Sequence, residues 1–398
     1  MSETLIITRK DNKIITAAFE ENEMLQVSVE KIEAENILGN IYIGKVKNII
    51  KNINAAFVEV EGKTMCYLPL DSNDNPIFTI PKKNKKIAVG DTIMVQIAKE
   101  NVKTKAAYAT TNFNFTGKYI VLTHGKCKIG ISKKITSEEE RERLKDILSS
   151  HKNENYGLIA RTNCEGASLD QIEQEIKVFD ALYENIIQFG VHKSRFTCIY
   201  HAPKTYVCNI RDGISDLLQE IVTDDDAICD EIKEYLNLYQ REDLKKLRFY
   251  EDTNFGLNQL YGIETKLEKA LQKQVWLKSG GTLVIEPTEA LTVIDVNTGK
   301  AIKGKRNVQE TFRKVNMEAA KEIAKQIRLR NLSGIILIDF IDLESNESKT
   351  DLLRFLNSLL KKDPIGTILV DMTALGLVEI TRKKVRKPLH EQVKNSII

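Results

Sequence analysis

The chain has 398 residues, enough for about two to four folding units. Apolar residues make up 42% of it and charged residues 29%, with few prolines, which excludes the disordered and fibrous classes. The net charge of +3 neither supports nor excludes nucleic-acid binding, because such proteins concentrate positive charge in patches.

The cysteines and the apolar runs indicate a cytoplasmic, soluble protein. No two of the six cysteines form a CxxC pair, so neither a zinc finger nor a thioredoxin-like motif is predicted, and reduced thiols are expected. The N-terminal residues MSETLIITRKDNKIITAAFEE lack the pattern of a signal peptide. No apolar run approaches the ~20 residues that a membrane helix needs, so no membrane partner is expected.

The first third of the chain is predicted to be β-structure. Residues 5–8 and 14–19 are β-prone runs separated by a turn at 10–13. A denser set of short strands follows, at residues 40–46, 55–60, 65–70 and 92–97. Short strands at this spacing, with Gly and Asn at the turns, indicate a small barrel.

The middle third mixes strands with helices. Strands are predicted at 118–122 and 157–162, and helices at 137–150, with Ser137 as the N-cap, and at 169–189. Residues 214–245 read as largely helical. The acidic run at residues 224–226 within them is interpreted as a helix start, because neighbouring residues do not converge on one metal ion.

The last third alternates strands and helices, a pattern that favours parallel pairing. The predicted strands are 282–286, 291–296, 335–340 and 368–371, and the predicted helices are 311–329 and 351–360. Gly334 follows the first of these helices and is expected at its left-handed cap.

Two aspartates occupy matching positions in this region. LTVIDVNTGK places Asp295 near the end of an apolar strand, and IILIDFIDLE places Asp339 at the same point of another. If the strands are parallel neighbours, both carboxylates lie at the carboxyl ends, where open α/β sheets bind ligands. Two close carboxylates repel each other and lose hydration, and a divalent cation offsets both effects. Asn297 lies on the same strand face as Asp295 and is expected to orient it or to contact a phosphate.

The alternative reading makes each aspartate a strand-end turn former or a helix cap. For one aspartate that alternative is preferred, but two in matched positions, with Asn297 beside one, favour a magnesium site. Asp342 and Glu344 either support this site or cap and solvate the next turn.

The segments EALTVIDVNTGK, NMEAAKEIAKQIRLRNLSGIILIDFIDLE and GLVEITRKKVRKPL resemble the catalytic region of the ribonuclease E/G family, and the resemblance runs through the whole chain. It implies an α+β multidomain fold: an RNase H-like subdomain with an inserted S1-like OB barrel, a 5′-sensor subdomain, and a C-terminal DNase I-like α/β catalytic subdomain. The RNase H-like subdomain is implied to be split between residues 1–35 and 210–278. The implied barrel, sensor and catalytic parts are residues 36–117, 118–209 and 279–398.

The resemblance also implies a reaction. Asp295 and Asp339 match the family's magnesium-binding aspartates, with one Mg²⁺ per active site, and Asn297 matches its supporting asparagine. The implied activity is endonucleolytic hydrolysis of single-stranded RNA that leaves 5′-phosphate ends, in rRNA processing and mRNA decay.

Two further sets of residues match RNA-contacting positions of the family. In the barrel these are Phe57, Tyr67 and Lys105, with Tyr67 where some members carry Phe. Without the resemblance, the two aromatics are equally well read as core residues. In the sensor they are Gly117, Val121, Arg161 and Thr162, which imply a preference for RNA with a 5′-monophosphate.

The chain departs from the family pattern at its last residues, KPLHEQVKNSII. Many members carry a CPxCxG motif that shares zinc across a dimer, and this sequence has no such motif, so zinc is not predicted. A homodimer or homotetramer is still expected, by an unspecified contact. A compact, ribonuclease G-like member fits better than a scaffold with a long tail.

The sequence allows two alternative functions, and both are disfavoured. An RNA-binding module without catalysis is disfavoured because both aspartates are present. A metal-dependent hydrolase of small phosphodiesters is disfavoured because a small substrate needs no aromatic barrel surface.

Overall fold

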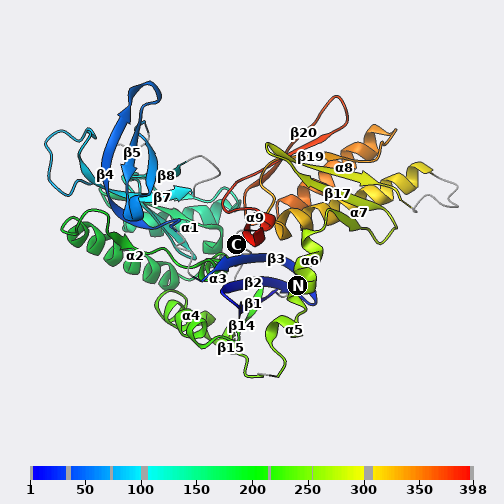
Figure 1. Cartoon of the computed structure of the whole chain (residues 1–398), viewed down its shortest axis with the longest axis horizontal. Coiled ribbons are helices and arrows are strands. Elements are labelled where there is room, and N and C mark those ends of the chain that lie inside the picture. Colours follow the sequence, from blue (N-terminus) through cyan, green and yellow to red (C-terminus); the bar gives the residue numbers. More distant parts are fainter. Residues whose placement is uncertain are drawn as a thin grey trace. The chain divides into compact units, whose positions relative to one another are not determined.

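The computed structural model describes residues 3–32, 37–71, 75–99, 106–213, 217–252, 254–299 and 308–394 (Figure 1). The chain forms two compact units, and each contains segments that are distant in sequence. One unit comprises residues 1–34, 216–229 and 246–398, and the other comprises residues 35–215 and 230–245. Both mix helices with sheets, so the predicted α+β class is confirmed.

The second unit contains a closed five-stranded barrel, which confirms the barrel prediction and is consistent with an OB-like fold. Its strands are β4 (Ile41–Ile50), β5 (Ala55–Glu59), β6 (Met65–Pro69), β7 (Thr92–Lys99) and β8 (Ala107–Thr110). The strand order is β4-β5-β6-β8-β7, and β7 pairs back with β4 to close the ring. The sequence analysis did not predict β8. Inward-facing residues such as Val58, Leu68 and Ile97 are fully buried, because side chains alternate along each strand.

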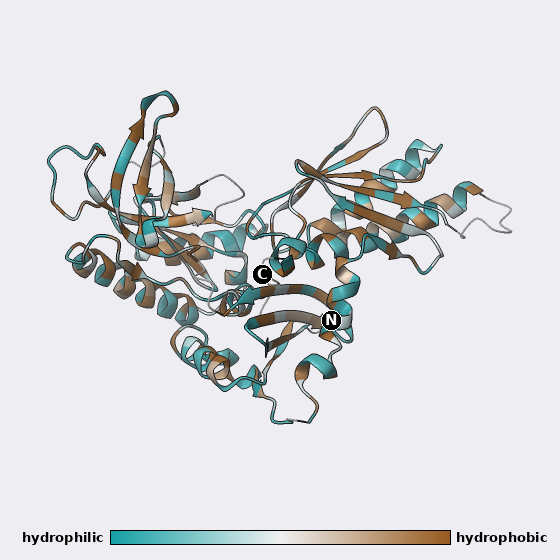
Figure 2. Ribbon diagram, in the orientation of Figure 1, coloured by the Kyte–Doolittle hydropathy of each residue, from teal (hydrophilic) through white to brown (hydrophobic). Residues whose placement is uncertain are grey.

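A four-stranded sheet with two long helices follows the barrel in the same unit. Its strands are β9 (Asn114–Thr116), β10 (Ile120–His124), β11 (Gly130–Ile131) and β12 (Tyr156–Ala160), in the order β11-β12-β10-β9. The helices are α1 (Glu138–Ser150) and α2 (Leu169–Gly190). Ser137 caps α1 as predicted, accepting from the Glu140 N–H. Figure 2 shows apolar and polar residues alternating along α2, as expected for a helix with one buried face.

The N-terminal strands belong to the other unit and form a five-stranded sheet. It contains β1 (Glu3–Lys10), β2 (Lys13–Glu20), β3 (Glu23–Lys31), β14 (Leu218–Thr223) and β15 (Leu247–Phe249), in the order β15-β14-β1-β2-β3. The prediction that residues 214–245 are largely helical was wrong where β14 lies. The helix begins only at Asp226, as α4 (Asp226–Tyr239). The acidic run does start this helix, since Asp225 Oδ1 accepts from the Ile228 N–H at 3.0 Å.

A six-stranded sheet covered by two helices completes this unit. Its order is β16-β17-β18-β19-β21-β20. The strands are β16 (Gln274–Trp276), β17 (Thr282–Pro287), β18 (Leu291–Asn297), β19 (Gly334–Asp339), β20 (Thr367–Met372) and β21 (Val378–Arg382). The covering helices are α7 (Val308–Leu329) and α8 (Asn346–Leu360), which share a core with β17, β18 and β19 (Figure 1). The remaining helices are α3 (Thr205–Asp212), α5 (Leu257–Leu260), α6 (Ile263–Leu271) and α9 (Leu389–Lys394), and β13 (Cys198–Tyr200) pairs with β4.

The predicted parallel pairing in this sheet is confirmed for β18 and β19, and α7 is the crossover helix between them. Its apolar stripe, including Ala319, Ile323 and Ile327, is fully buried against the sheet. Each buried Ile contributes about 1.5–3 kcal/mol relative to its exposed state.

The prediction that Gly334 caps the preceding helix was wrong. Asn331, with φ of 48°, is the left-handed residue there. The Asn331 N–H bonds to Arg328 O, and the Leu332 N–H bonds to Ile327 O, which is the Schellman arrangement. Asn tolerates this backbone conformation better than other side chains, so glycine is not required. Gly334 instead begins β19.

All six cysteines lie within the described residues, and none of them is in a disulfide there. Within the described ranges, the structure has no helix with both the length and the apolar character needed to cross a bilayer.

Candidate active site

Asp295 and Asp339 are register partners on the parallel strands β18 and β19, as the sequence predicted. Each is at or near the carboxyl end of its strand. On β18, Thr292, Ile294 and Val296 are buried, whereas Leu291, Val293, Asp295 and Asn297 share the opposite, more open face. Asp295 is half-buried and Asp339 is exposed, so both carboxylates remain accessible to solvent. The free-energy cost of desolvating them is therefore smaller than that expected for two carboxylates that lose their hydration.

The two carboxylates influence each other electrostatically. The pKa of Asp339 is raised by partial desolvation, and next by the negative charges of Asp295 and Asp342. The part of this shift that comes from Asp295 and Asp342 reflects repulsion between neighbouring carboxylates. A bound cation would remove the repulsion.

Asn297 contacts Asp295 directly. Its Nδ2 donates a hydrogen bond to Asp295 Oδ2 at 2.7 Å. The Asn297 amide therefore bonds to only one oxygen of the Asp295 carboxylate, and Oδ1 takes no part in this hydrogen bond. Asp342 contributes negative charge near Asp339, while the backbone N–H of Glu344 bonds to Gln309 Oε1 at 3.3 Å.

The donor set decides which cation fits. Among the described residues, no group of three or more His, Cys, Asp or Glu side chains converges on one point. Among the described residues, Asp295 and Asp339 would supply a cation with two carboxylates. Magnesium binds in this way, through one or two carboxylates and several waters, whereas zinc prefers nitrogen and sulfur ligands.

The barrel brings the two predicted aromatics together on its surface. Phe57 of β5 and Tyr67 of β6 are register partners, with ring centroids 6.1 Å apart at 71°. Both side chains are half-buried, while their strand neighbours Val58 and Leu68 are fully buried. The two rings therefore lie on the outer side of the barrel wall, which favours a contact role over a core role. Lys105 lies outside the described residues.

Sequence reasoning missed a third ring in this row. Tyr108 of β8 is the register partner of Tyr67, and their centroids are 6.0 Å apart. Lys99 Nζ lies 5.1 Å from the centroid of the Tyr108 ring. The available signal was the alternation in AAYATT, which puts Tyr108 between the buried Ala107 and Ala109. We name the surface formed by Phe57, Tyr67, Tyr108 and Lys99 the aromatic row.

The predicted sensor residues lie around the ends of β10 and β12. Arg161 Nη1 donates to the Gly117 carbonyl, so these two residues are in contact. Thr162 Oγ1 is hydrogen-bonded to Ser132 Oγ at 3.0 Å. Val121 of β10 pairs in register with Ile159, two residues before Arg161. The structure thus brings Arg161 and Gly117 together and puts Val121 on the adjacent strand.

Two acidic residues that the sequence analysis missed hold this arrangement. Asp212 Oδ1 accepts from Arg161 Nη2 at 2.8 Å. Burial alone raises the pKa of Asp212, but the hydrogen bonds and charges of Arg211 and Arg161 outweigh it and keep the pKa below its usual range. Asp212 therefore stays charged and fixes the guanidinium.

Glu175 on α2 is the other acidic residue. Its carboxylate accepts from the backbone N–H groups of Lys118, Tyr119 and Ile120 at 2.7, 2.9 and 2.7 Å. A Cβ on Gly117 would lie 2.3–2.5 Å from this carboxylate group, so only glycine fits there. The signal in the sequence was a glutamate on the buried stripe of α2, next to Ile176.

An accessible carboxylate pair at the carboxyl ends of neighbouring strands, with an amide bound to one carboxylate, is typical of enzymes that use a divalent cation to hydrolyse phosphodiesters. Comparisons with known proteins agree with this class. The sequence profile of the ribonuclease E/G family matches residues 114–385, more than half of the chain.

Relatives match over nearly the full chain. A ribonuclease G of Haemophilus influenzae is 35% identical over 398 residues, covering 97% of this chain and 80% of the relative. The ribonuclease G of Escherichia coli strain K12 is 30% identical over 405 residues, covering 99% and 82%. A ribonuclease E of Nostoc sp. strain PCC 7120 is 31% identical over 392 residues, covering 95% of this chain and 55% of the relative.

The chain therefore belongs to the ribonuclease E/G family, and it is an endoribonuclease. This confirms the family resemblance and the enzyme class inferred from the sequence.

Proposed function

We propose that the protein is a magnesium-dependent endoribonuclease that hydrolyses single-stranded RNA, leaves 5′-phosphate ends, and favours 5′-monophosphorylated substrates in RNA processing and decay. The observation that carries the proposal is the register pairing of Asp295 with Asp339 at accessible positions of two parallel strands.

In this proposal Asp295 and Asp339 would hold the cation through their carboxylate oxygens. Asn297 donates to Asp295 Oδ2, so Oδ1 would be the oxygen left for the cation. When bound, Mg²⁺ supplies Lewis-acid stabilisation of negative charge on the phosphodiester and lowers the pKa of a coordinated water.

The aromatic row binds unpaired bases. Phe57, Tyr67 and Tyr108 are neighbouring rings, and stacking on such rings contributes roughly 1–3 kcal/mol per base without selecting sequence. Lys99 lies beside Tyr108 and Lys105 follows in sequence, and both supply charge for the RNA backbone. Such a surface selects single strands, because only unpaired bases expose both faces.

The 5′ end is recognised by Arg161 and Thr162, with Gly117 and Val121 completing the pocket. Arg161 is one-quarter exposed, and Asp212 and the Gly117 carbonyl hold its guanidinium in place. A guanidinium fixed in this way loses little side-chain entropy when it binds a phosphate. A 5′-monophosphate offers the terminal oxygens that such a group recognises.

We further propose the five-part subdomain layout implied by the family resemblance, and a homodimer or homotetramer in the cytoplasm. The parallel pairing of β1 with β14 supports a subdomain assembled from distant segments, because it joins residues 3–7 to residues 218–223. Light scattering with and without a chelator tests the assembly.

The central experiment is RNA cleavage. A 5′-monophosphorylated single-stranded RNA is incubated with the protein and Mg²⁺, beside the Asp295→Asn variant and a chelated control. We expect internal cleavage with 5′-phosphate products, and a loss of at least about 100-fold in rate for the variant. RNA binding without cleavage would indicate a binding module, and equal rates for both proteins would remove the carboxylate pair from the mechanism.

A further inference from the structure

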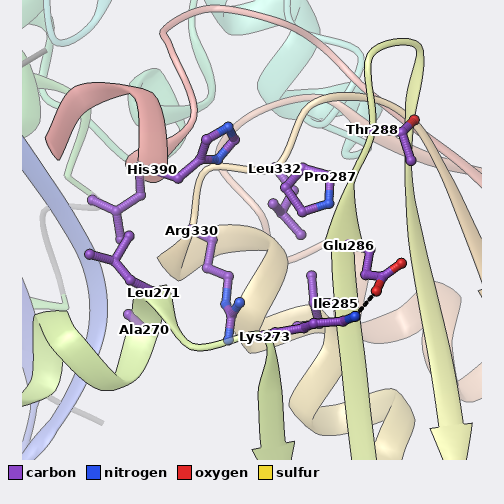
Figure 3. A pocket seen from close by; sticks show the side chains of 11 residues that line it. Ala270, Leu271, Lys273, Ile285, Glu286, Pro287, Thr288, Arg330, Leu332 and His390 are labelled. Atoms are coloured by element: carbon purple, nitrogen blue, oxygen red, sulfur yellow. Dashed lines mark ion pairs between the residues drawn. The ribbon is translucent and has the colours of Figure 1, made fainter. Parts of the chain in front are cut away.

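A cavity of about 320 Å³ lies in the unit that contains the six-stranded sheet, apart from the carboxylate pair (Figure 3). It is formed between the end of α6, strand β17, the residues that follow α7, and the start of α9. The residues that line it are Ala270, Leu271, Lys273, Ile285, Glu286, Pro287, Thr288, Arg330, Leu332, Leu389 and His390. No part of the proposed RNA cleavage uses this cavity.

Arg330 is the unusual member of the lining. Only 7% of its surface is exposed, although it carries a charge. Its Nε donates to Gln326 Oε1 at 2.6 Å, but Nη2 is buried and has no hydrogen-bond partner among the described residues. Burial also lowers the pKa of Arg330 to about 10. A buried cationic donor without an acceptor is destabilising, so the site is incomplete as it stands.

The other charged groups of the lining do not supply the missing acceptor. Lys273 and Glu286 form an ion pair with each other, as Figure 3 shows. His390 is half-buried, and burial lowers its pKa, so it is neutral near pH 7. Glu322 is a charge partner of Arg330 and accepts from Gln326 Nε2 at 2.7 Å, but it leaves Arg330 Nη2 without an acceptor.

The walls of the cavity are otherwise apolar. Ala270, Ile285, Leu332 and Leu389 are buried, and Leu271 is 37% exposed at the edge. Such walls fit a hydrocarbon or ring body, and a small number of polar groups then sets its orientation. The Arg330 guanidinium has an unsatisfied Nη2, and its planar fork pairs with carboxylate or phosphate oxygens.

We propose that this cavity binds a small organic anion, with its carboxylate or phosphate paired with the Arg330 guanidinium and its apolar body against Ile285, Leu332 and Leu389. The ligand supplies an anionic acceptor to a guanidinium whose Nη2 has no hydrogen-bond partner among the described residues. Its apolar body displaces water from walls that offer water few hydrogen bonds. The proposal does not depend on the nuclease function.

Ligand-observed NMR titration tests the site with probes of one chain length. Hexanoate and hexyl phosphate carry the two kinds of anion, hexanol carries none, and inorganic phosphate has no apolar body. We expect hexanoate or hexyl phosphate to bind about tenfold or more tightly than hexanol and inorganic phosphate. The tighter of the two identifies the anion. Equal binding of hexanol, or no binding of either anionic probe, would overturn the proposal.

Two variants locate the binding. Arg330→Met removes the guanidinium, and Arg313→Met, at a half-exposed position on the preceding helix α7, is the matched control. Leu271→Trp keeps Arg330 and fills the cavity from its edge, which covers the possibility that Arg330→Met fails to fold. We expect Arg330→Met and Leu271→Trp to lose anion binding about tenfold, and Arg313→Met to retain it. Unchanged binding in Leu271→Trp would place the anion elsewhere.

Discussion

Asn297 donates its Nδ2 hydrogen bond to Oδ2 of Asp295 at 2.7 Å, two positions along the same face of β18. This contact fixes the orientation of one proposed metal ligand. We therefore predict that Asn297→Ala weakens magnesium binding, with a loss of about 10- to 100-fold in metal affinity or activity. The measurement is the cleavage rate as a function of Mg²⁺ concentration.

The control for Asn297 is Thr381→Ala, an exposed position on β21 of the same sheet. Its magnesium curve should match that of the unaltered protein. If Asn297→Ala gives a normal magnesium curve and a normal maximal rate, the amide has no part in orienting Asp295.

The aromatic row predicts a role for Tyr108 in RNA binding. Replacing Tyr108 with Ala removes one ring from the row and should weaken single-stranded RNA binding by roughly 1–3 kcal/mol. Tyr108→Phe is the matched control, because stacking uses the ring face and not the hydroxyl. Fluorescence anisotropy with a short labelled RNA gives both values. Equal weakening by Ala and Phe would point to the hydroxyl and contradict stacking.

The sensor predicts a difference between two RNAs of one sequence. Arg161→Ala should slow cleavage of 5′-monophosphorylated RNA about 10- to 100-fold, the effect of losing charge-assisted hydrogen bonds. Cleavage of the 5′-hydroxyl RNA should change much less. Arg143→Ala is the control, since Arg143 pairs with Glu140 and is about one-third exposed. Equal slowing of both RNAs by Arg161→Ala would show that Arg161 supports the fold and not the phosphate.

The barrel and the six-stranded sheet could be predicted largely because their strands carry strong local patterns. Apolar alternation marks β4 and β5, and the apolar runs of β18 and β19 flank a long amphipathic helix. The short run LQEIVT of β14 has no such pattern. Its strand state comes from pairing with β1, more than 200 positions earlier, and this long-range contact overrides local preference.

The residues of the candidate site also differ in whether the sequence could predict them. Asp295 and Asp339 could be predicted because each marks the end of a recognisable strand, and parallel pairing then aligns them. Tyr108 could not, since its place beside Tyr67 depends on the parallel pairing of β6 with the short strand β8. Asp212 could not either, because it meets Arg161 across 51 positions of sequence.

His124 on β10 predicts a pH-dependent stability. Its Nε2 lies 3.0 Å from the Asn75 carbonyl, so Nε2 carries the proton, and Nδ1 accepts from the Tyr183 hydroxyl at 2.7 Å. Burial lowers the pKa of His124 below its usual value near 6.5. The folded state therefore binds fewer protons than the unfolded state below about pH 6.5. The contribution of neutral His124 to the free energy of unfolding is complete above about pH 6.5 and falls as the pH drops toward the lowered pKa.

Thermal unfolding of His124→Asn beside the unaltered protein tests this effect of pH. The variant should be less stable near about pH 8, because Asn fills less of the space beside Phe113 and loses the paired hydrogen bonds. The difference in Tm should narrow as the pH falls through about 6 to 5, since only the histidine must then be protonated on unfolding. The exposed His192→Asn is the matched control and should follow the unaltered protein. A His124→Asn difference that stays constant with pH would mean that the cost is packing alone.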